Sequence, residues 1–266
     1  MSPVEAGPLN DSVFDVRDVH YAYDSGGEAL TGVSLSVRRS EQVAILGANG
    51  SGKSTLLKML DGLYFPSTGS VHAFARPLTE RALQDEAFNF AFRKRVGLVF
   101  QDSDVQLFSP SVWDEVAFAP LQMGLGRAEI SERVDGALQA LRITHLKDRP
   151  PHRLSAGEKK RVALASVLSL DPEVWLLDEP TAGLDPRSQA WLVRFLQEQA
   201  RAGRTVVTAT HDLDLVPLIS SRAYILGENH ELVAQGPAVE ALSDHALLVA
   251  CNLLGQDGHV HLPAPR

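Results

Sequence analysis

The sequence predicts an α/β fold with a largely parallel sheet, and three observations support this prediction. Short apolar runs typical of strands alternate with helical patterns along most of the chain. The runs at 42–46, 96–100 and 174–177 are apolar almost throughout, as expected for strands buried on both faces of a sheet. Strands that alternate with helices require right-handed crossovers, which place the strands side by side in one direction.

The other elements follow in chain order. Residues 1–12, rich in Pro, Gly and Ser, are expected to form a flexible lead-in. Alternating runs at 13–16 and 33–37 predict short strands, and we expect an antiparallel β subdomain at this end of the chain. The remaining expected elements are helices at 54–60, 127–141, 158–168 and 186–202, a strand at 205–209, a hairpin around residues 227–229, and small helices near 237–242 and 244–250.

Domain organisation follows from where the helical patterning is densest. Residues 103–170 carry most of it, and we expect them to form a helical subdomain inserted between two central strands. The main domain is expected to cover 13–240, and 241–266 to form a C-terminal helix and tail. At 266 residues the length fits one large domain.

Composition excludes several classes of protein. Apolar residues make up 44% and charged residues 22%, so a core can form. The net charge of −8 argues against a protein that coats nucleic acid, and we expect no nucleic-acid partner. The single Cys251 excludes an internal disulfide and a cysteine-based zinc site. Because no run approaches the ~20 apolar residues of a membrane span, any membrane role requires a partner.

One glycine-rich segment carries a phosphate-binding pattern. Residues 47–54 match G-x-x-x-x-G-K-[ST], in which glycines let backbone N–H groups point at phosphate oxygens and the following helix adds its positive N-terminus. A chance glycine-rich turn is the alternative, but a buried strand before the loop and a helix after it favour nucleotide binding. Lys53 is expected to reach the β- and γ-phosphates and Ser54 to ligate Mg²⁺. The expected nucleotide-binding residues here are Gly47, Asn49, Gly50, Ser51, Gly52, Lys53, Ser54 and Thr55.

Two adjacent carboxylates end the third buried strand. Asp178 is placed to hold Mg²⁺, and Glu179 is placed to polarise an attacking water. Alone, such a pair is more typical of an acidic helix cap. The phosphate loop upstream favours the catalytic interpretation.

Further motifs in the same order make the chain resemble the ATP-binding subunit of ABC transporters. The segment 154–158 resembles the signature motif of that family, Gln101 the Q-loop glutamine and 182–185 the D-loop. His211 resembles the switch histidine, and Tyr23 lies where the family places an aromatic side chain under adenine. The resemblance covers about residues 13–240 and implies a P-loop NTPase core of the RecA-like kind, with ATP and Mg²⁺ as ligands.

The resemblance also implies roles for these residues. Gln101 is expected at the metal and His211 at the γ-phosphate, whereas alone His211 would be interpreted as a polar strand end. Ser155 and Gly157 are expected to face the ATP of a second subunit, and Asp185 of the D-loop is a further expected nucleotide-binding residue. The implied assembly is a head-to-tail dimer, of identical or paralogous chains, with two ATP sites at the interface.

Two residues depart from the family's signature. Ala156 replaces the usual glycine, and its methyl group fits if the local φ is negative. Glu158 replaces the usual glutamine. Its negative charge near a phosphate site is unfavourable unless it points away, toward Lys159 or Arg161.

The segment 99–120 resembles the Q-loop region of energy-coupling-factor ATPases, and among these the chain is most similar to the ATPases of cobalt and nickel uptake. This resemblance implies a bacterial subunit on the cytoplasmic face of the membrane, docked on a transmembrane coupling protein that works with a substrate-capturing membrane subunit. Leu107, Phe108 and Val112 are the expected docking residues, with packing inside the helical subdomain as an equally good alternative.

Three alternative functions stay open at this level. The chain can power an importer of a vitamin or another small solute. A non-transport ABC ATPase acting on nucleic acid is a second alternative, which the negative charge disfavours. A small-molecule kinase with a phosphate loop is a third, and it would lack the signature segment and the D-loop.

Overall fold

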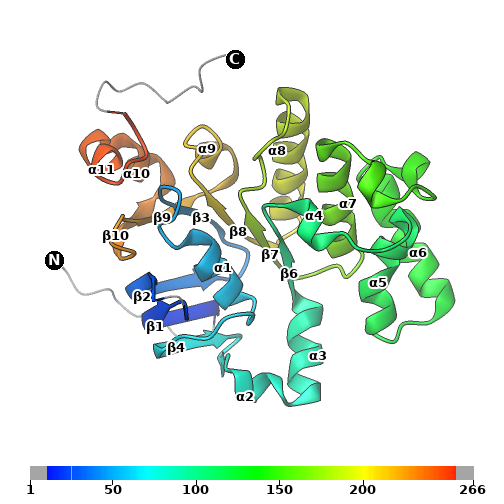
Figure 1. The fold of residues 1–266 in the computed structure, drawn as a ribbon, viewed down its shortest axis with the longest axis horizontal. Helices are drawn as coiled ribbons and strands as arrows, with labels where there is room; N and C mark the ends of the chain where they lie inside the picture. The colour runs from blue at the N-terminus through cyan, green and yellow to red at the C-terminus, as the bar shows by residue number, and fades with distance from the viewer. Residues whose placement is uncertain (1–10, 25, 256–266) are drawn as a thin grey trace. The chain divides into compact units, whose positions relative to one another are not determined.

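The computed structural model describes residues 11–24 and 26–255, in two compact units (Figure 1). The first unit contains residues up to 84 and from 209 onward, and the second contains residues 85–208. The lead-in expected at 1–12 lies outside the described residues except for its last two positions, as does the tail from residue 256. Within the described ranges, no helix has the length and apolarity that crossing a bilayer requires.

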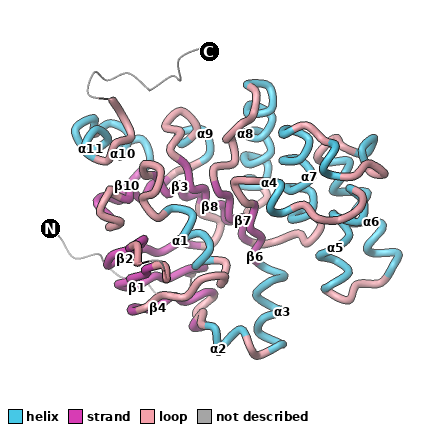
Figure 2. The backbone as a smooth tube through the Cα atoms, in the orientation of Figure 1, coloured by secondary structure: helices cyan, strands magenta, loops and turns pink. Residues whose placement is uncertain are grey.

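An antiparallel sheet in the first unit confirms the predicted β subdomain. Its strands follow the order β2-β1-β4-β5, and Figure 2 shows β2, β1 and β4 side by side. Strand β4 is absent from the predicted elements because it begins with Thr68 and Gly69 and offers few apolar residues. The strands are β1 (Ser12–Ala22), β2 (Glu28–Arg38), β4 (Thr68–Ala73) and β5 (Arg76–Pro77).

A second set of strands in this unit carries the glycine-rich loop. Strand β3 (Gln42–Leu46), buried from Val43 to Leu46, pairs in parallel with β9 (Arg222–Leu226). β9 pairs in turn with β10 (Leu232–Pro237), which confirms the predicted hairpin. The helices of this unit are α1 (Lys53–Leu60), α2 (Glu80–Leu83), α9 (Val216–Ile219), α10 (Ala238–Ser243) and α11 (His245–Ala250).

The C-terminal helices complete the core of the first unit. Leu248 of α11 and the nearby Cys251 are buried in one cluster with Leu46 of β3 and Ile225 of β9. Removing such side chains from water is the main favourable contribution to folding, at about 25 cal/mol per Å² of apolar surface. The end of the chain therefore stabilises the strand that leads into the glycine-rich loop.

The second unit combines buried strands with a group of helices. Strands β6 (Val96–Val99) and β7 (Val174–Asp178) are parallel, and β8 (Thr205–Thr210) begins beside β7. Helices α5, α6 and α7 pack against one another (Figure 1). The helices are α3 (Glu86–Arg95), α4 (Ser103–Gln106), α5 (Val112–Gln122), α6 (Arg127–Ala140), α7 (Ala156–Leu168) and α8 (Pro186–Arg201), with 3₁₀ turns at Thr144–Leu146 and Pro151–Arg153.

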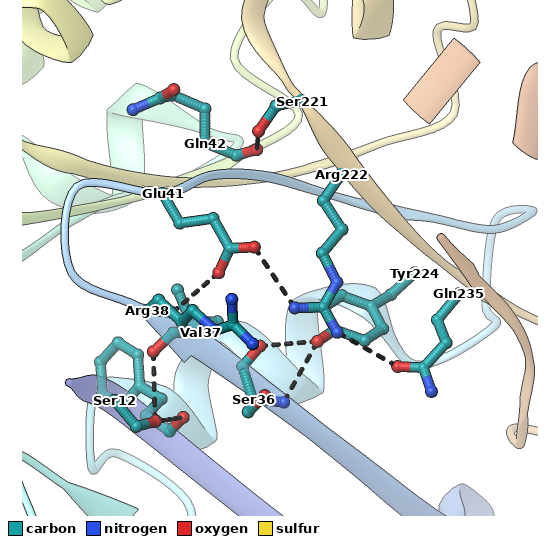
Figure 3. A network of polar contacts seen from close by, with 11 residues as sticks. Ser12, Ser36, Val37, Arg38, Glu41, Gln42, Ser221, Arg222, Tyr224 and Gln235 are labelled. Carbon is teal, nitrogen blue, oxygen red and sulfur yellow. Dashed lines mark hydrogen bonds and ion pairs between the residues drawn. The ribbon is translucent and has the colours of Figure 1, made fainter. Parts of the chain in front are cut away.

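A polar network ties the two sets of strands of the first unit together (Figure 3). The buried Tyr224 of β9 donates its hydroxyl proton to Ser36 O at 2.6 Å, and its oxygen accepts the Ser36 N–H at 3.2 Å. Glu41 accepts the Arg38 N–H at 2.8 Å and pairs with Arg222 at 3.3 Å. Arg222 also lies over the Tyr224 ring, 4.8 Å from its centroid. Because Glu41 immediately precedes β3, this network fixes the start of the strand that carries the loop.

We expect Tyr224→Phe to lower the free energy of unfolding by about 1–3 kcal/mol, because both Ser36 backbone groups lose a buried partner. Chemical denaturation followed by circular dichroism measures the change. Tyr64→Phe is the matched control, since it removes a hydroxyl from a half-buried ring and should cost much less. Equal effects of the two variants would contradict the importance given to the network.

Candidate functional site

The glycine-rich loop runs from the end of β3 to the start of α1. Lys53, only 5% exposed, donates from Nζ to Gly47 O at 2.9 Å and to Ala48 O at 3.0 Å, so it lies along the loop's own backbone. Gly52 is the N-cap of α1 with φ 105°, and a Cβ there would lie 2.2 Å from Ala29 O. The loop thus brings the N-terminal N–H groups of an eight-residue helix beside a buried ammonium, an arrangement suited to a polyphosphate.

Tyr23 lies near this loop in an aromatic group. Its hydroxyl is hydrogen-bonded to Thr55 Oγ1 at 2.6 Å, and its ring contacts those of Tyr21 and Tyr64 edge-on. The rings of Tyr21 and Tyr64 stack on each other at 5.3 Å. Tyr23 is 39% exposed, so part of its surface is available to a ligand. The sequence did not predict that Tyr21 and Tyr64 pack around Tyr23, because Tyr64 is far from the other two residues in the sequence.

His211, the remaining predicted residue of the first unit, follows β8 and is exposed. The turn after it is fixed by Thr210, whose Oγ1 accepts the Asp212 N–H at 3.0 Å. Asp212 Oδ1 in turn accepts the N–H groups of Asp214 and Leu215. The histidine therefore occupies a strand end whose following turn is well defined.

In the second unit, two parallel strands bring three predicted residues to one edge. Val99 of β6 is in register with Leu177 of β7. Gln101 follows the first strand by two residues, and Asp178 ends the second. Glu179, buried like Asp178, has φ 41°, an uncommon conformation that turns the chain sharply after the strand. The sheet register thus brings the chain positions of Gln101, Asp178 and Glu179 to the same edge of the sheet.

Ser155 begins helix α7 in a way that corrects one expectation. Glu158 does not point toward Lys159 or Arg161: its Oε2 accepts both the Ser155 N–H and the Ser155 hydroxyl at 2.8 Å. Ser155 Oγ accepts the Glu158 N–H in return, which completes a capping box. The backbone bond from Ser155 lowers the pKa of the Glu158 carboxyl. Ala156 is not among the residues with positive φ, so its methyl group fits as expected.

The predicted signature and D-loop residues are close together. A Cβ on Gly157 would lie 3.3 Å from Ser188 Oγ. Ser188 donates that hydroxyl proton to Asp185 Oδ2 at 2.7 Å. Asp185 is the N-cap of α8, as predicted, and its Oδ1 accepts the N–H groups of Arg187 and Ser188. The N-termini of α7 and α8 therefore lie side by side.

Lys160 is a residue of this region that the sequence did not single out. It is 3% exposed on α7, and its Nζ donates to Phe100 O at 3.0 Å and to Gln101 O at 2.9 Å. Burial lowers the pKa of its ammonium to about 8, while Asp178 and Asp102 act in the opposite direction. The only signal in the sequence is its place in a run of basic residues, which more often marks an exposed face.

The expected docking residues differ in exposure. Phe108 is 67% exposed and Leu107 is half-buried, but Val112 is fully buried at the start of α5, so its expected docking role is wrong. Phe108 contacts Phe118 edge-on at 4.9 Å. Phe118 and Leu121 of α5 are also exposed, and their i, i+3 spacing is the signal that predicts a shared face. We call Phe108, Phe118 and Leu121 the apolar patch.

The predicted residues thus fall into two groups, each formed within one unit. The first unit holds Tyr23, the glycine-rich loop and His211, and the second holds Gln101, Ser155, Gly157, Asp178, Glu179 and Asp185. Within the second unit, the Gln101 amide and the Asp178 carboxylate offer oxygen atoms of the kind that Mg²⁺ prefers, and Mg²⁺ usually takes one or two protein groups together with substrate phosphates. Among the described residues no three His, Cys, Asp or Glu side chains form a cluster that could hold a metal ion.

Comparisons with known proteins agree with this geometry. The family model described as ABC transporter matches residues 30–182. A putative ABC transporter ATP-binding protein of Methanosarcina acetivorans is 47% identical over 94% of this chain and 92% of its own length. The nickel import ATP-binding protein NikO of Rhodobacter capsulatus is 51% identical over 92% of this chain and 97% of its own length.

Solved structures show the same fold. The protein cbiO1 of Clostridium perfringens, part of the ABC transporter complex cbiONQ, matches with a TM-score of 0.76 and 40% identity, over 91% of this chain and 95% of its own. A dimeric bacterial ABC transporter cassette matches with a TM-score of 0.76 and 26% identity, over 85% of this chain and 98% of its own. The fold is therefore that of a P-loop NTPase, as predicted. The chain belongs to the ABC transporter family, as an ATP-binding subunit whose hydrolysis of ATP is coupled to transport.

Proposed function

We propose that this chain is the ATP-hydrolysing motor of an energy-coupling-factor importer that takes up cobalt or nickel ions. The observation that carries the proposal is the 51% identity, over nearly the full length, to a nickel import ATP-binding protein. The likeness to cbiO1, part of the complex cbiONQ, supports the same subgroup. In this proposal residues 13–240 form the ATPase domain, with the helical subdomain within 103–170.

The residues have the following roles in the proposed reaction. Backbone N–H groups of the glycine-rich loop and the Lys53 ammonium bind the phosphates, and the Tyr23 ring packs against adenine. Ser54, Gln101 and Asp178 hold Mg²⁺, which when bound neutralises charge on the β- and γ-phosphate oxygens. The loop residues that complete the cradle are Gly47, Asn49, Gly50, Ser51, Gly52 and Thr55.

The hydrolytic step is a displacement by water. Glu179 accepts a proton from a water molecule while the water oxygen attacks the γ-phosphorus. The bond between the γ-phosphorus and the bridging oxygen breaks, and that oxygen leaves with ADP. His211 binds the γ-phosphate. Two chains associate head to tail, and Ser155, Gly157 and Asp185 of each chain complete the ATP site of its partner. ATP binding closes this dimer and hydrolysis reopens it.

The partner proposed for the apolar patch is a transmembrane coupling protein, which places the chain on the cytoplasmic face of a bacterial membrane. Exposed aromatic side chains of this size are enriched at protein interfaces. Neighbouring Phe108 and Phe118 supply such a surface outside the nucleotide-binding residues. A separate membrane subunit captures the transported ion.

The identity of the transported ion is tested by measuring uptake in cells that produce the whole transporter. Deleting this chain should abolish uptake of radioactive cobalt or nickel, and the wild-type chain should restore it. Unchanged uptake of both ions with lost uptake of another solute would overturn the proposed cargo and favour an importer of a vitamin or other small solute.

Glu179→Gln should lower the turnover of ATP by roughly 10²-fold or more while ATP binding is retained, because the water loses its base. Size-exclusion chromatography with ATP should show an accumulated dimer. Glu173→Gln is the control, since that carboxylate forms a partly exposed pair with Arg95. If Glu179→Gln turned over ATP at the wild-type rate, the assignment of Glu179 as the base would be wrong.

Phe108→Ser should release the chain from the membrane fraction without changing the ATPase activity of the purified chain. The reason is that the apolar patch lies outside the nucleotide-binding residues. Phe90→Ser, at a 47% exposed aromatic on α3, is the matched control and should leave membrane association unchanged. Membrane association retained by Phe108→Ser would place the docking surface elsewhere.

A further inference from the structure

Lys160 is a buried cation to which the proposed reaction gives no role. Taking an ammonium out of water costs free energy unless hydrogen bonds and opposite charges compensate. Here Nζ donates to the carbonyl oxygens of Phe100 and Gln101, and the carboxylates of Asp102 and Asp178 favour the charged form. The Lys160 side chain therefore joins helix α7 to the backbone of Phe100 and Gln101, the two residues that follow β6.

The side chain of Gln106 also connects the backbone of Phe100 to helix α7. Gln106 of α4 accepts the Phe100 N–H through Oε1 at 3.2 Å. Its Nε2 donates to Ala163 O at 3.2 Å and to Ser166 Oγ at 3.3 Å, both on α7. Both backbone polar groups of Phe100 are thus held by residues bound to or part of α7. We call Lys160 and Gln106, with these partners, the α7 brace.

The brace connects two parts that serve different ATP molecules. Under the proposed function, Ser155 at the start of α7 binds the ATP of the partner chain's site, whereas Gln101 belongs to its own chain's site. If Ser155 shifted α7 on engaging phosphate, the helix would carry Lys160 with it, and the two hydrogen-bonded carbonyl groups would follow. The backbone of Gln101 would then move with the occupancy of the other site.

We propose that Lys160 is a positioning residue that couples the two ATP sites of the dimer, by moving Gln101 in concert with helix α7. This inference rests on the proposed dimer with shared sites. Coupling between two sites appears as cooperativity, with a Hill coefficient limited by the number of sites. Lys160 acts through the backbone of Gln101 and does not touch ATP.

The test is the dependence of ATPase rate on ATP concentration for the full chain. Lys160→Met keeps the length and apolar stem but loses the donors, and it should lower the Hill coefficient from near 2 to near 1. ATP binding to the single chain, measured with a fluorescent analogue, should be unchanged. Lys160→Gln, which retains an N–H donor, should restore part of the cooperativity.

Lys159→Met is the matched control, because Lys159 lies next to Lys160 on α7 but pairs with Asp104 at 2.5 Å. It should keep the wild-type Hill coefficient. If Lys160→Met does not fold, Gln106→Leu cuts the other half of the brace and should give the same loss of cooperativity.

Two outcomes separate the inference from the proposed function. Wild-type cooperativity in a stable Lys160→Met, or in Gln106→Leu where Lys160→Met is unfolded, overturns the inference and leaves the proposed function intact. Absence of any ATP-dependent dimer in both the wild type and Glu179→Gln overturns the proposed shared sites, and the inference with them.

Discussion

The turn from β3 into α1 depends on how closely the backbone of Gly52 approaches the carbonyl oxygen of Ala29 in β2. A side chain at this position would have its Cβ 2.2 Å from that oxygen, and the left-handed φ of 105° adds strain for any residue other than glycine. This approach lets the loop curl tightly enough to bring Lys53 onto the carbonyls of Gly47 and Ala48. The N-terminal N–H groups of α1 follow directly from the turn, so the geometry of the loop is a property of the backbone.

The surroundings of the loop are arranged to keep that turn in place. The Tyr224 and Glu41 contacts hold the end of β2 and the start of β3, and the hydrophobic cluster with Leu248 and Cys251 packs against β3 itself. Polar contacts specify the geometry, while apolar burial supplies most of the free energy. Residues that are distant from the glycine-rich loop in the sequence thus support its conformation.

In the second unit, helix α7 supports predicted site residues as the surroundings of the loop do in the first unit. Its first turn carries Ser155 in a capping box, and its second turn carries Lys160 under the strand end that leads to Gln101. The capping box also explains how a glutamate is accommodated in the signature segment: Glu158 satisfies the helix N-terminus, where negative charge is favourable. A charge that was expected to be a disadvantage at a phosphate site is a local stabiliser in the structure.

The sequence by itself determined the elements that have a strong periodicity and the motifs whose chemistry is local. Buried strands 42–46 and 174–177, the caps at Asp185 and the glycine-rich loop were all predictable, because their signals lie within a few neighbouring residues. Strand β4 and helix α3 were not predicted. A glycine weakens the strand pattern of β4, and α3 has only Phe88 and Phe92 as buried residues.

Only the tertiary structure decided what depends on contacts between distant segments. Val112 is buried and Phe108 is exposed although both are apolar, because the packing of α5 assigns each to a different environment. The direction of Glu158 and the burial of Lys160 are likewise set by what the surrounding helices and strand ends offer as partners. Hydrogen bonding and desolvation depend on three-dimensional neighbours, and the order of residues alone does not contain them.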